Sequence, residues 1–288
     1  MTRNAADNAD VDALARTLDD AALQARAVPR LTETAPLLDV ETGYAVQRAL
    51  VQRRLDRGER MAGVKLGFTS KAKMRQMGVA DLIWGRLTDA MRCADGATLD
   101  LDRFVHPRIE PEIAFLLDRP LAGEVSGEEA ARAVGAVAPA YEIIDSRYEG
   151  FRFSLPDVVA DNSSSAGFGI GLWRDASSFD PVAGLADLGM ALEVDGRPAE
   201  TGSSAAILGH PLRSLVAAAR LAAEAGLVLE AGWVVLAGAP TAAVPLEPGR
   251  HVRVNAGGLG RVEVTTAQST TQSTTQSATQ SMAKETDR

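Results

Sequence analysis

The chain has 288 residues, of which 46% are hydrophobic, and a formal net charge of −8 at pH 7. This length and apolar content are sufficient for a sizeable core, while the negative charge argues against sequence-independent binding of nucleic acid or of an anionic membrane. No run of about 18 uncharged apolar residues predicts a membrane span, and the polar first residues predict no secretory signal. Cys93 is the only cysteine, so an intrachain disulfide is excluded and a cytoplasmic protein is expected.

Hydrophobic residues at helical spacing predict two helices near the start of the chain. The first extends over about residues 10–27, and the second starts near Asp39 or Thr42 and ends at about Arg57. We expect residues 1–60 to form an N-terminal helical segment.

Short apolar runs interrupted by glycine follow from residue 61 onward and predict strands. Candidate strands span residues 63–66, 109–117, 138–144, 166–172, 189–194, 233–237 and 251–264, and candidate helices span residues 70–77, 127–133 and 211–225. Many short strands with few helices predict an α+β fold with a barrel-like or rolled sheet, which we assign to a catalytic domain over residues 61–266. No β-α-β alternation is visible, so a Rossmann domain is not expected.

A polar low-complexity segment forms the end of the sequence, residues 267–288. Its four-residue repeat of Ser, Thr and Gln lacks the apolar residues that a core requires, so we expect disorder there. We assign no function to this segment.

Two glutamates one residue apart, Glu110 and Glu112, lie in a predicted strand. Side chains at positions i and i+2 of a strand point to the same face, so the two carboxylates are expected side by side. Like charges in a partly buried place are costly unless a cation compensates them, and a hard divalent cation prefers oxygen ligands. The pattern predicts either a metal site or a solvated strand face.

Lysine is rare in this chain, because only four of the 30 basic residues are lysines: Lys65, Lys71, Lys73 and Lys284. Lys65 lies in a short strand flanked by Gly63 and Gly67. It is either an exposed lysine of an edge strand or a cation that contacts a substrate carboxylate or moves a proton.

Further polar residues stand in apolar or turn-like surroundings. Glu142 lies within an apolar strand, and residues 161–165 place five hydrogen-bonding side chains before a glycine-rich strand. Each has a structural alternative, an exposed position or a turn. Together with Lys65 and the paired glutamates, they indicate a metal-dependent acid site.

Common catalytic motifs are absent from the sequence: it has no dinucleotide-binding glycine motif, no Walker A loop, no nucleophile elbow and no His-Glu-x-x-His. His106, His210 and His251 are scattered, so a zinc site is not expected. Oxygen donors dominate, which favours Mg²⁺ or Mn²⁺.

Five motifs together resemble the family of 2-keto-4-pentenoate hydratases and 4-oxalocrotonate decarboxylases, within the fumarylacetoacetate hydrolase superfamily. They are Gly63-Val-Lys-Leu-Gly-Phe-Thr-Ser-Lys-Ala-Lys-Met74, Trp84-Gly-Arg-Leu-Thr-Asp-Ala-Met91, Pro107-Arg-Ile-Glu-Pro-Glu-Ile-Ala-Phe115, Glu142-Ile-Ile-Asp-Ser-Arg147 and Asp157-Val-Val-Ala-Asp-Asn-Ser-Ser-Ser-Ala-Gly167. The resemblance covers roughly residues 40–264. It implies a mixed β-roll with an N-terminal helical part, in a protein that is usually oligomeric.

The resemblance also implies roles for individual residues. The implied ligands of Mg²⁺ or Mn²⁺ are Glu110, Glu112 and Glu142. Lys65 would lie beside the substrate, and Asp89 matches the position of an active-site acid.

The implied substrate contacts come from several segments of the chain. They are the Leu66 backbone, Asp161 and one serine among Ser163, Ser164 and Ser165. Arg147 or Arg152 would hold a distal carboxylate, an expectation that rests on charge and location.

Two reactions compete within the family. The segments Thr88-Asp-Ala-Met91, His106-Pro-Arg-Ile-Glu-Pro-Glu112 and 145–156 are more similar to the decarboxylase branch. We therefore expect conversion of 4-oxalocrotonate (2-oxo-3-hexenedioate) to 2-hydroxypenta-2,4-dienoate and CO₂ in meta-cleavage catabolism of aromatic compounds. The alternative is hydration of 2-hydroxypenta-2,4-dienoate, also called 2-keto-4-pentenoate.

The expected partners are a 2-oxo-enedioate substrate, further copies of the chain and a sister hydratase. A non-catalytic partner subunit is a weaker alternative, because all three glutamates are present. Hydrolysis of a diketo acid is also weaker, because no histidine precedes His106 to activate water.

Overall fold

The computed structural model describes residues 5–69 and 82–268. The predicted helix over residues 70–77, Lys71, Lys73 and all but the first two residues of the predicted disordered tail lie outside the described residues. No helix in the described part of the chain combines the length and the hydrophobicity that a membrane crossing requires.

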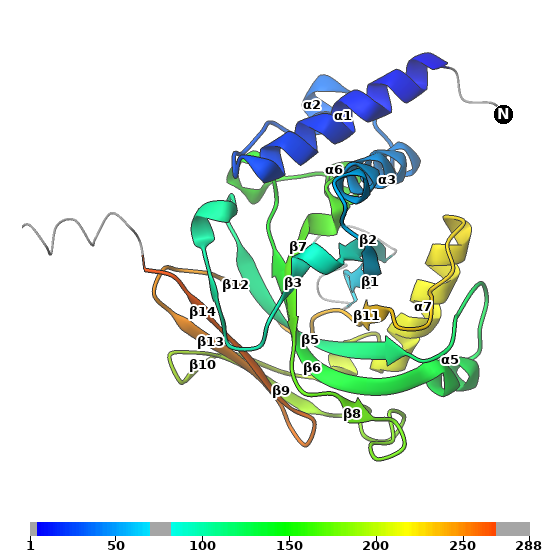
Figure 1. Ribbon diagram of the computed structural model, residues 1–288, viewed down its shortest axis with the longest axis vertical. Coiled ribbons are helices and arrows are strands. Elements are labelled where there is room, and N and C mark those ends of the chain that lie inside the picture. Colours follow the sequence, from blue (N-terminus) through cyan, green and yellow to red (C-terminus); the bar gives the residue numbers. More distant parts are fainter. Residues whose placement is uncertain (1–4, 70–81, 269–288) are drawn as a thin grey trace, which may run out of the picture.

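Three helices form the N-terminal part of the structure, above the sheets in Figure 1. They are α1 (Ala5–Leu23), α2 (Leu31–Thr34) and α3 (Val40–Asp56). The Asp39 side chain caps α3 by accepting a hydrogen bond of 2.7 Å from the Thr42 backbone N–H. Buried residues such as Leu18 and Val46 pack α1 against α3. The division of the chain at residue 60 stays a prediction.

The main sheet has nine strands in the order β2-β1-β11-β5-β6-β7-β3, with β12 paired to β5 and β8 paired to β6. Their bounds are β1 (Met61–Gly67), β2 (Ile83–Thr88), β3 (Arg92–Cys93), β5 (Arg108–Leu117), β6 (Val134–Ile144), β7 (Ser165–Ile170), β8 (Arg174–Asp175), β11 (Val234–Leu236) and β12 (Val244–Pro245). The β1–β11 and β3–β7 pairs are parallel and the others are antiparallel, so the sheet is mixed.

A second sheet of five strands has the order β10-β9-β13-β14-β4. Its strands are β4 (Ala97–Leu99), β9 (Gly189–Val194), β10 (Arg197–Ser203), β13 (His251–Ala256) and β14 (Gly260–Thr266). The predicted single strand over residues 251–264 is therefore wrong, because a turn at residues 257–259 divides it into a hairpin. Val252 and Val254 of β13 pack against Ile109 and Ile143 of the main sheet.

The remaining helices cover other parts of the main sheet. They are α5 (Gly127–Ala133), α6 (Leu155–Ala160) and α7 (Pro211–Glu224), with single 3₁₀ turns η1 (Asp89–Met91), η2 (Leu101–Arg103), η3 (Glu149–Phe151), η4 (Asn162–Ser164) and η5 (Ser204–Ala206). Leu212 and Leu215 of α7 pack into the same core as Phe115 of β5. In Figure 1, α5 and α7 lie at the end of the sheet away from the five-stranded sheet.

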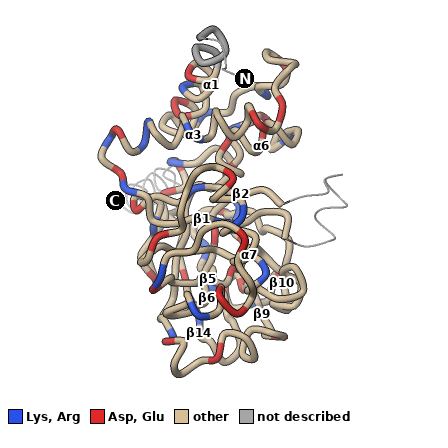
Figure 2. Tube along the Cα trace, turned by 90° about the vertical axis from the view of Figure 1, so that its right-hand side faces the viewer, with Lys and Arg blue, Asp and Glu red and all other residues tan. Residues whose placement is uncertain are grey.

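Acidic and basic residues are interspersed along the coloured part of the chain trace in Figure 2. This distribution fits the modest net charge of the sequence. The α+β class with a rolled mixed sheet and N-terminal helices, predicted from the sequence, is confirmed.

Candidate metal centre

Three glutamates from two neighbouring strands form a buried cluster. Glu110 of β5 is directly opposite Glu142 of β6 in the antiparallel ladder, and Glu112 follows two residues later on the same face. Carboxylate oxygens of the three side chains lie within 4.8 Å of one another. Glu110 is 7% exposed, and Glu112 and Glu142 are fully buried, which removes the solvated strand face as an explanation.

Alternation along the two strands explains why the glutamates share one face. Ile109 and Ile143 point to the opposite face and pack against the five-stranded sheet. The five-stranded sheet therefore backs the strands that carry the glutamates, and the carboxylates lie on the inner face of the curled main sheet.

Burial and mutual repulsion change the acidity of the cluster. Burial raises the pKa of Glu112 well above its usual range, the Glu142 and Glu110 carboxylates raise it further, and Lys65 opposes the shift. Burial also raises the pKa of Glu142, again opposed by Lys65. Three carboxylates share one buried lysine among the described residues, and a divalent cation is a further compensation that suits such a cluster.

Lys65 lies in the centre of this arrangement. Its Nζ is 3.2 Å from Oε2 of Glu142, and the residue is only 3% exposed. Because β1 is paired on both sides, with β2 and with β11, the alternative of an exposed edge-strand lysine is wrong. The Leu66 side chain is buried in the core next to it.

Gly85 makes room for Lys65 on the neighbouring strand. It is the partner of Lys65 in the β1–β2 ladder. A Cβ atom at this position would lie 3.2 Å from Cε of Lys65 and 2.6 Å from the carbonyl oxygen of Asn162. The close approach of these three residues therefore requires glycine in β2.

The oxygens of the cluster have different partners. Glu142 accepts hydrogen bonds from Ser165 Oγ at 2.7 Å and from Lys65 Nζ at 3.2 Å, one on each oxygen. Glu112 accepts one at Oε2 from the Gly238 backbone N–H at 2.6 Å. Its Oε1 is buried and, within the described part of the chain, has no hydrogen-bond partner.

These observations test whether the residues fit a metal ion. The donor set consists of carboxylate oxygens, which hard divalent cations prefer. The buried Oε1 of Glu112, which has no described partner and lies beside two further carboxylates, is costly without a cation. The residues therefore fit Mg²⁺ or Mn²⁺.

A strained turn brings the serine cluster to this site. Asn162, Ser163 and Ser164 have φ values of 49°, 53° and 58°, a left-handed conformation that non-glycine residues rarely adopt. The Asn162 side chain accepts from the Arg86 backbone N–H at 2.8 Å and donates to the Arg86 carbonyl oxygen at 2.9 Å. These two bonds attach the turn to β2.

The three serines of the turn have different surroundings. Ser163 donates to the carbonyl oxygen of Trp84 at 2.8 Å, and Ser165 donates to Glu142. The Ser164 hydroxyl is buried and has no partner among the described residues. It is therefore the serine whose hydroxyl remains available for another group.

Arg147 and Asp161 bind each other at the start of the turn. The Arg147 backbone N–H and Nε donate to the two carboxylate oxygens of Asp161 at 2.9 and 2.5 Å, and Nη2 donates to the Asp161 carbonyl oxygen at 2.6 Å. Burial raises the pKa of Asp161 to about 6, against the opposing effect of Arg147. Both side chains are buried, whereas Arg152 is exposed.

Asp89 lies at the surface, in contact with Arg60. Its carboxylate accepts from the Arg60 backbone N–H at 2.9 Å and from Nε at 3.1 Å, and these bonds lower the pKa of Asp89. The side chain is 41% exposed. Its role as an active-site acid stays a prediction.

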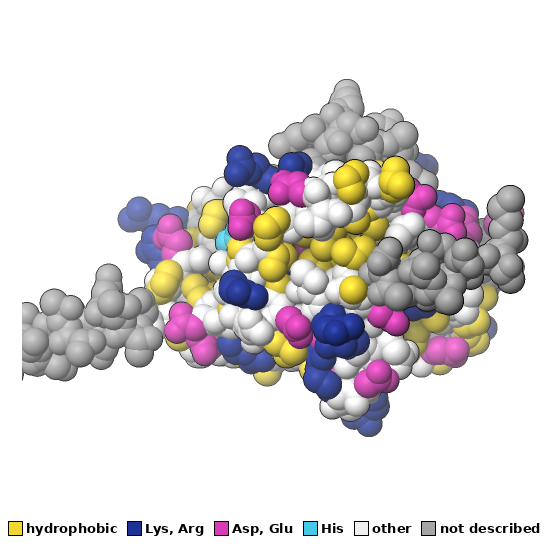
Figure 3. All heavy atoms as spheres, turned by 90° about the horizontal axis from the view of Figure 1, so that it is seen from above, with side chains coloured by type: hydrophobic (Ala, Val, Ile, Leu, Met, Phe, Trp, Pro, Cys, Tyr) yellow, Lys and Arg dark blue, Asp and Glu magenta, His cyan; other side chains and the backbone are white. Residues whose placement is uncertain are grey.

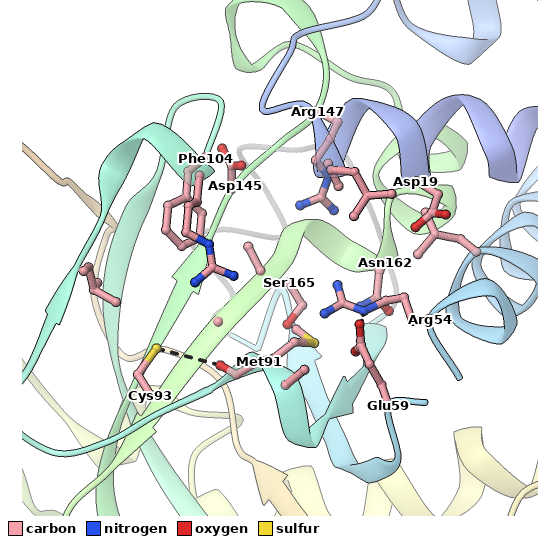
Figure 4. Close-up of a pocket in the computed structure, with 18 of the residues that line it drawn as sticks. Asp19, Arg54, Glu59, Met91, Cys93, Phe104, Asp145, Arg147, Asn162 and Ser165 are labelled. Atoms are coloured by element: carbon pink, nitrogen blue, oxygen red, sulfur yellow. Dashed lines mark hydrogen bonds and ion pairs between the residues drawn. The ribbon is translucent and has the colours of Figure 1, made fainter. Parts of the chain in front are cut away.

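A cavity of about 320 Å³ lies between the N-terminal helices and the main sheet. Figure 4 shows its lining, to which Arg54, Met91, Arg147 and Ser165 contribute. The three glutamates are not among its lining residues, so the cavity adjoins the cluster through Ser165.

Comparison with known proteins assigns the chain to a family. Residues 64–267 match the model of the fumarylacetoacetate hydrolase C-terminal family. The chain belongs to the fumarylacetoacetate hydrolase family. The predicted resemblance to this superfamily is thus confirmed.

Members of this family with assigned reactions match nearly the whole chain. A 4-oxalocrotonate decarboxylase from Pseudomonas sp. is 52% identical over 89% of this chain and 98% of its own length. A 2-keto-4-pentenoate hydratase from Paraburkholderia xenovorans is 35% identical over 86% of this chain and 91% of its own.

A solved structure of the family has the same fold. It is 4-oxalocrotonate decarboxylase from Pseudomonas putida G7, complexed with magnesium and adipate, which is 37% identical and superimposes with a TM-score of 0.86. The match covers 92% of this chain and 99% of the other.

The sequence did not single out Gly85 or Gly238, and it gave Ser165 only as one of three candidate serines for a substrate carboxylate. A glycine within the apolar run of β2 is a signal for close approach of another group. Gly238 gave no comparable signal, and the contact of Ser165 with Glu142 was not predictable, because both hydrogen bonds depend on how distant segments meet.

Proposed function

We propose that this protein is a metal-dependent decarboxylase that converts 4-oxalocrotonate (2-oxo-3-hexenedioate) to 2-hydroxypenta-2,4-dienoate and CO₂. The observation that carries the proposal is 52% identity to a 4-oxalocrotonate decarboxylase over 98% of that enzyme's length, against 35% for a hydratase. The buried glutamate cluster supports the metal dependence.

In this proposal, Glu110, Glu112 and Glu142 hold Mg²⁺ or Mn²⁺. Magnesium is favoured because a decarboxylase of the same fold is complexed with it. When bound, the ion supplies a Lewis acid that stabilises negative charge on the substrate.

Decarboxylation of this substrate needs a place for an electron pair. The bond between C5 and the distal carboxylate carbon breaks, and its electrons delocalise through the C3–C4 alkene onto the C2 oxygen. Lys65 places a buried cation in the site where this charge develops, and stabilising such charge lowers the barrier. An N–H of Lys65 then donates the proton that completes the 2-hydroxy group of the product.

The polar groups around the cluster position the substrate. The Ser164 hydroxyl, which is buried and without a described partner, donates to a substrate carboxylate. The Leu66 backbone lines the site beside Lys65. Ser163, Asp161 and Arg147 hold the turn that presents Ser164.

A homo-oligomer and a complex with a sister hydratase belong to the same proposal. Leu23 and Leu37 of the N-terminal part are exposed by 64% and 96%, and hydrophobic side chains gather on the face seen from above in Figure 3. Such surfaces fit association with another protein surface. The cytoplasmic location stays a prediction that rests on the low cysteine content.

The deciding experiment is an assay of the purified protein with 2-oxo-3-hexenedioate and Mg²⁺, following CO₂ release and product absorbance. We expect CO₂ release that EDTA stops and added Mg²⁺ restores. Turnover of 2-hydroxypenta-2,4-dienoate without CO₂ release from 2-oxo-3-hexenedioate would instead identify a hydratase.

A further inference from the structure

Ser165 reaches Glu142 because of an irregularity in the sheet. Glu142 is opposite Phe168 and Ile143 is opposite Gly167, but Ile144 is opposite Ser165. One extra residue, Ala166, is therefore inserted in β7. Such a bulge changes the face of the sheet on which the neighbouring side chain lies.

The bulge decides which face of the sheet Ser165 occupies. In a regular ladder Ile144 would pair with Ala166, and Ser165 would lie on the face opposite to Glu142. Because Ser165 itself pairs with Ile144, its side chain lies on the Glu142 face. The 2.7 Å hydrogen bond from Ser165 Oγ to Glu142 Oε1 follows from this placement.

The segment before Ser165 is fixed independently. Three consecutive non-glycine residues with positive φ precede it, and such a conformation persists only where the surrounding structure fixes it. The bonds of Asn162 to Arg86 and of Ser163 to Trp84 hold the strained segment in place. Both the turn and the bulge thus present the Ser165 hydroxyl to the carboxylate.

We propose that Ser165 is a positioning residue of the metal centre. This inference rests on the proposed function, because it takes Glu142 as a metal ligand. The Ser165 hydroxyl holds Oε1 and Lys65 holds Oε2, so the plane of the carboxylate is fixed before a metal ion binds. Hydrogen-bond partners of metal ligands orient them in this way and are worth roughly 10–100-fold in metal affinity.

The test is Mn²⁺ binding, measured by isothermal titration calorimetry and by the EPR signal of free Mn²⁺. Ser165→Ala is expected to bind Mn²⁺ roughly 10–100-fold more weakly than the wild type. Ser165→Thr, which keeps the hydroxyl, is expected to restore the affinity, since Ser165 borders the cavity that accommodates the extra methyl group. The matched control is Ser214→Ala, because Ser214 is also buried and lies in α7.

The outcomes separate this inference from the proposed function. If the wild type does not bind Mn²⁺, the metal centre itself is wrong. If the wild type binds Mn²⁺ and Ser165→Ala binds it equally well, the positioning role is wrong. The role is also wrong if Ser165→Thr binds Mn²⁺ as weakly as Ser165→Ala.

A folding effect is separated by a further variant and a second readout. Ser165→Cys keeps the shape of the side chain but is a weak donor, so it is expected to melt like the wild type in EDTA and still bind Mn²⁺ more weakly. A lower melting temperature in EDTA with unchanged Mn²⁺ affinity would make Ser165 a purely structural residue and overturn the inference.

Discussion

Burial and charge act against each other at Glu112. The side chain is fully buried beside two other glutamates, and one of its oxygens has no partner among the described residues. A carboxylate in such a place destabilises the metal-free fold unless it takes up a proton. The ionised carboxylate is also the kind of ligand that a hard divalent cation prefers.

Glu112→Gln is expected to separate the two effects. The metal-free variant should melt at a higher temperature than the metal-free wild type, because glutamine neither buries a charge nor has to take up a proton on folding. Mn²⁺ affinity and decarboxylation should fall by more than the roughly 10–100-fold that an outer hydrogen-bond partner contributes. Thermal melts in EDTA, Mn²⁺ titration calorimetry and decarboxylase assays in Mg²⁺ measure these three quantities.

Glu124→Gln serves as the control for Glu112→Gln, since Glu124 is exposed. Glu124→Gln should leave the melting temperature, the Mn²⁺ affinity and the decarboxylation rate unchanged. Unchanged metal affinity in Glu112→Gln would remove Glu112 from the ligand set.

Lys65→Met is expected to lower kcat more than it raises KM. The substitution keeps an unbranched side chain of similar length but removes the ammonium that contacts Glu142. Loss of a proton donor or charge stabiliser typically costs roughly 10²–10⁴-fold in rate. Steady-state kinetics with saturating Mg²⁺ measure the two parameters, and an increase in KM alone would restrict Lys65 to substrate binding.

At this scale the sequence predicted the residues whose chemistry is visible in their type and spacing. Glu110, Glu112, Glu142 and Lys65 were predicted to belong to one metal-dependent acid site, with Lys65 beside the substrate, and the structure brings all four together. Their roles, like those of the other predicted site residues, stay predictions until the variants are measured.

The β1–β2 pair is the element that holds the site most closely together. It carries Lys65 on one strand, and the other strand is bonded to the Asn162 turn. Gly85 of β2 contacts both Lys65 and Asn162, and there is no space for a Cβ atom at this position. The position of the turn and that of the lysine therefore depend on each other.

Gly85→Ala is expected to reduce both stability and activity. The added methyl group would meet the Asn162 carbonyl oxygen at 2.6 Å, and overpacking of this kind typically costs roughly 1–3 kcal/mol in unfolding free energy. Denaturant unfolding and the decarboxylase assay measure the two effects.

Gly189→Ala is the matched control, because Gly189 also lies in a strand and has no atom within 4 Å of an added Cβ. It should fold and turn over like the wild type. Equal behaviour of both variants would show that β2 tolerates a side chain at this point.

Elements with clear periodicity or strong punctuation were predictable, and those that depend on their neighbours were not. The predicted helix over residues 127–133 has the bounds of α5, and the one over 211–225 differs from α7 by one residue. β2 was missed because Arg86 and Thr88 interrupt its apolar pattern, and both are buried only through tertiary contacts. The bulge in β7 has no sequence signature, since it is defined by its pairing with β6.

The unfolding stability of the whole molecule is expected to depend on pH and on whether a metal ion is bound. The pKa of Glu112 is raised above its usual value of 4.5, so the metal-free folded state holds a proton that the unfolded chain releases. Stability of the metal-free protein therefore falls as pH rises above about 4.5. A bound cation replaces the proton, so the stabilisation by Mg²⁺ should grow over the same range.

Thermal unfolding at pH 5 and pH 8, with EDTA or with saturating Mg²⁺, measures this coupling. The increase in melting temperature on adding Mg²⁺ should be larger at pH 8 than at pH 5, and Glu112→Gln should reduce the difference. An Mg²⁺ effect that is equal at both pH values would contradict the raised pKa of the cluster.

The fold class could be predicted at the level of the molecule, but the strand order could not. Many short strands indicated a rolled sheet, and the structure has one. The parallel pairing of β1 with β11 joins segments about 170 residues apart in the chain. Nothing in the local sequence of either strand encodes that partner.

The extra residue in β7 also has an evolutionary consequence. A residue inserted between Ile143 and Ile144 of β6 would pair with Ala166, restore a regular ladder and turn the Ser165 hydroxyl to the other face of the sheet, away from Glu142. A single codon thus determines whether the Glu142 carboxylate accepts a hydrogen bond from the Ser165 hydroxyl. Insertion at this point gives such a chain a one-step route to a different metal affinity while the serine itself stays in the sequence.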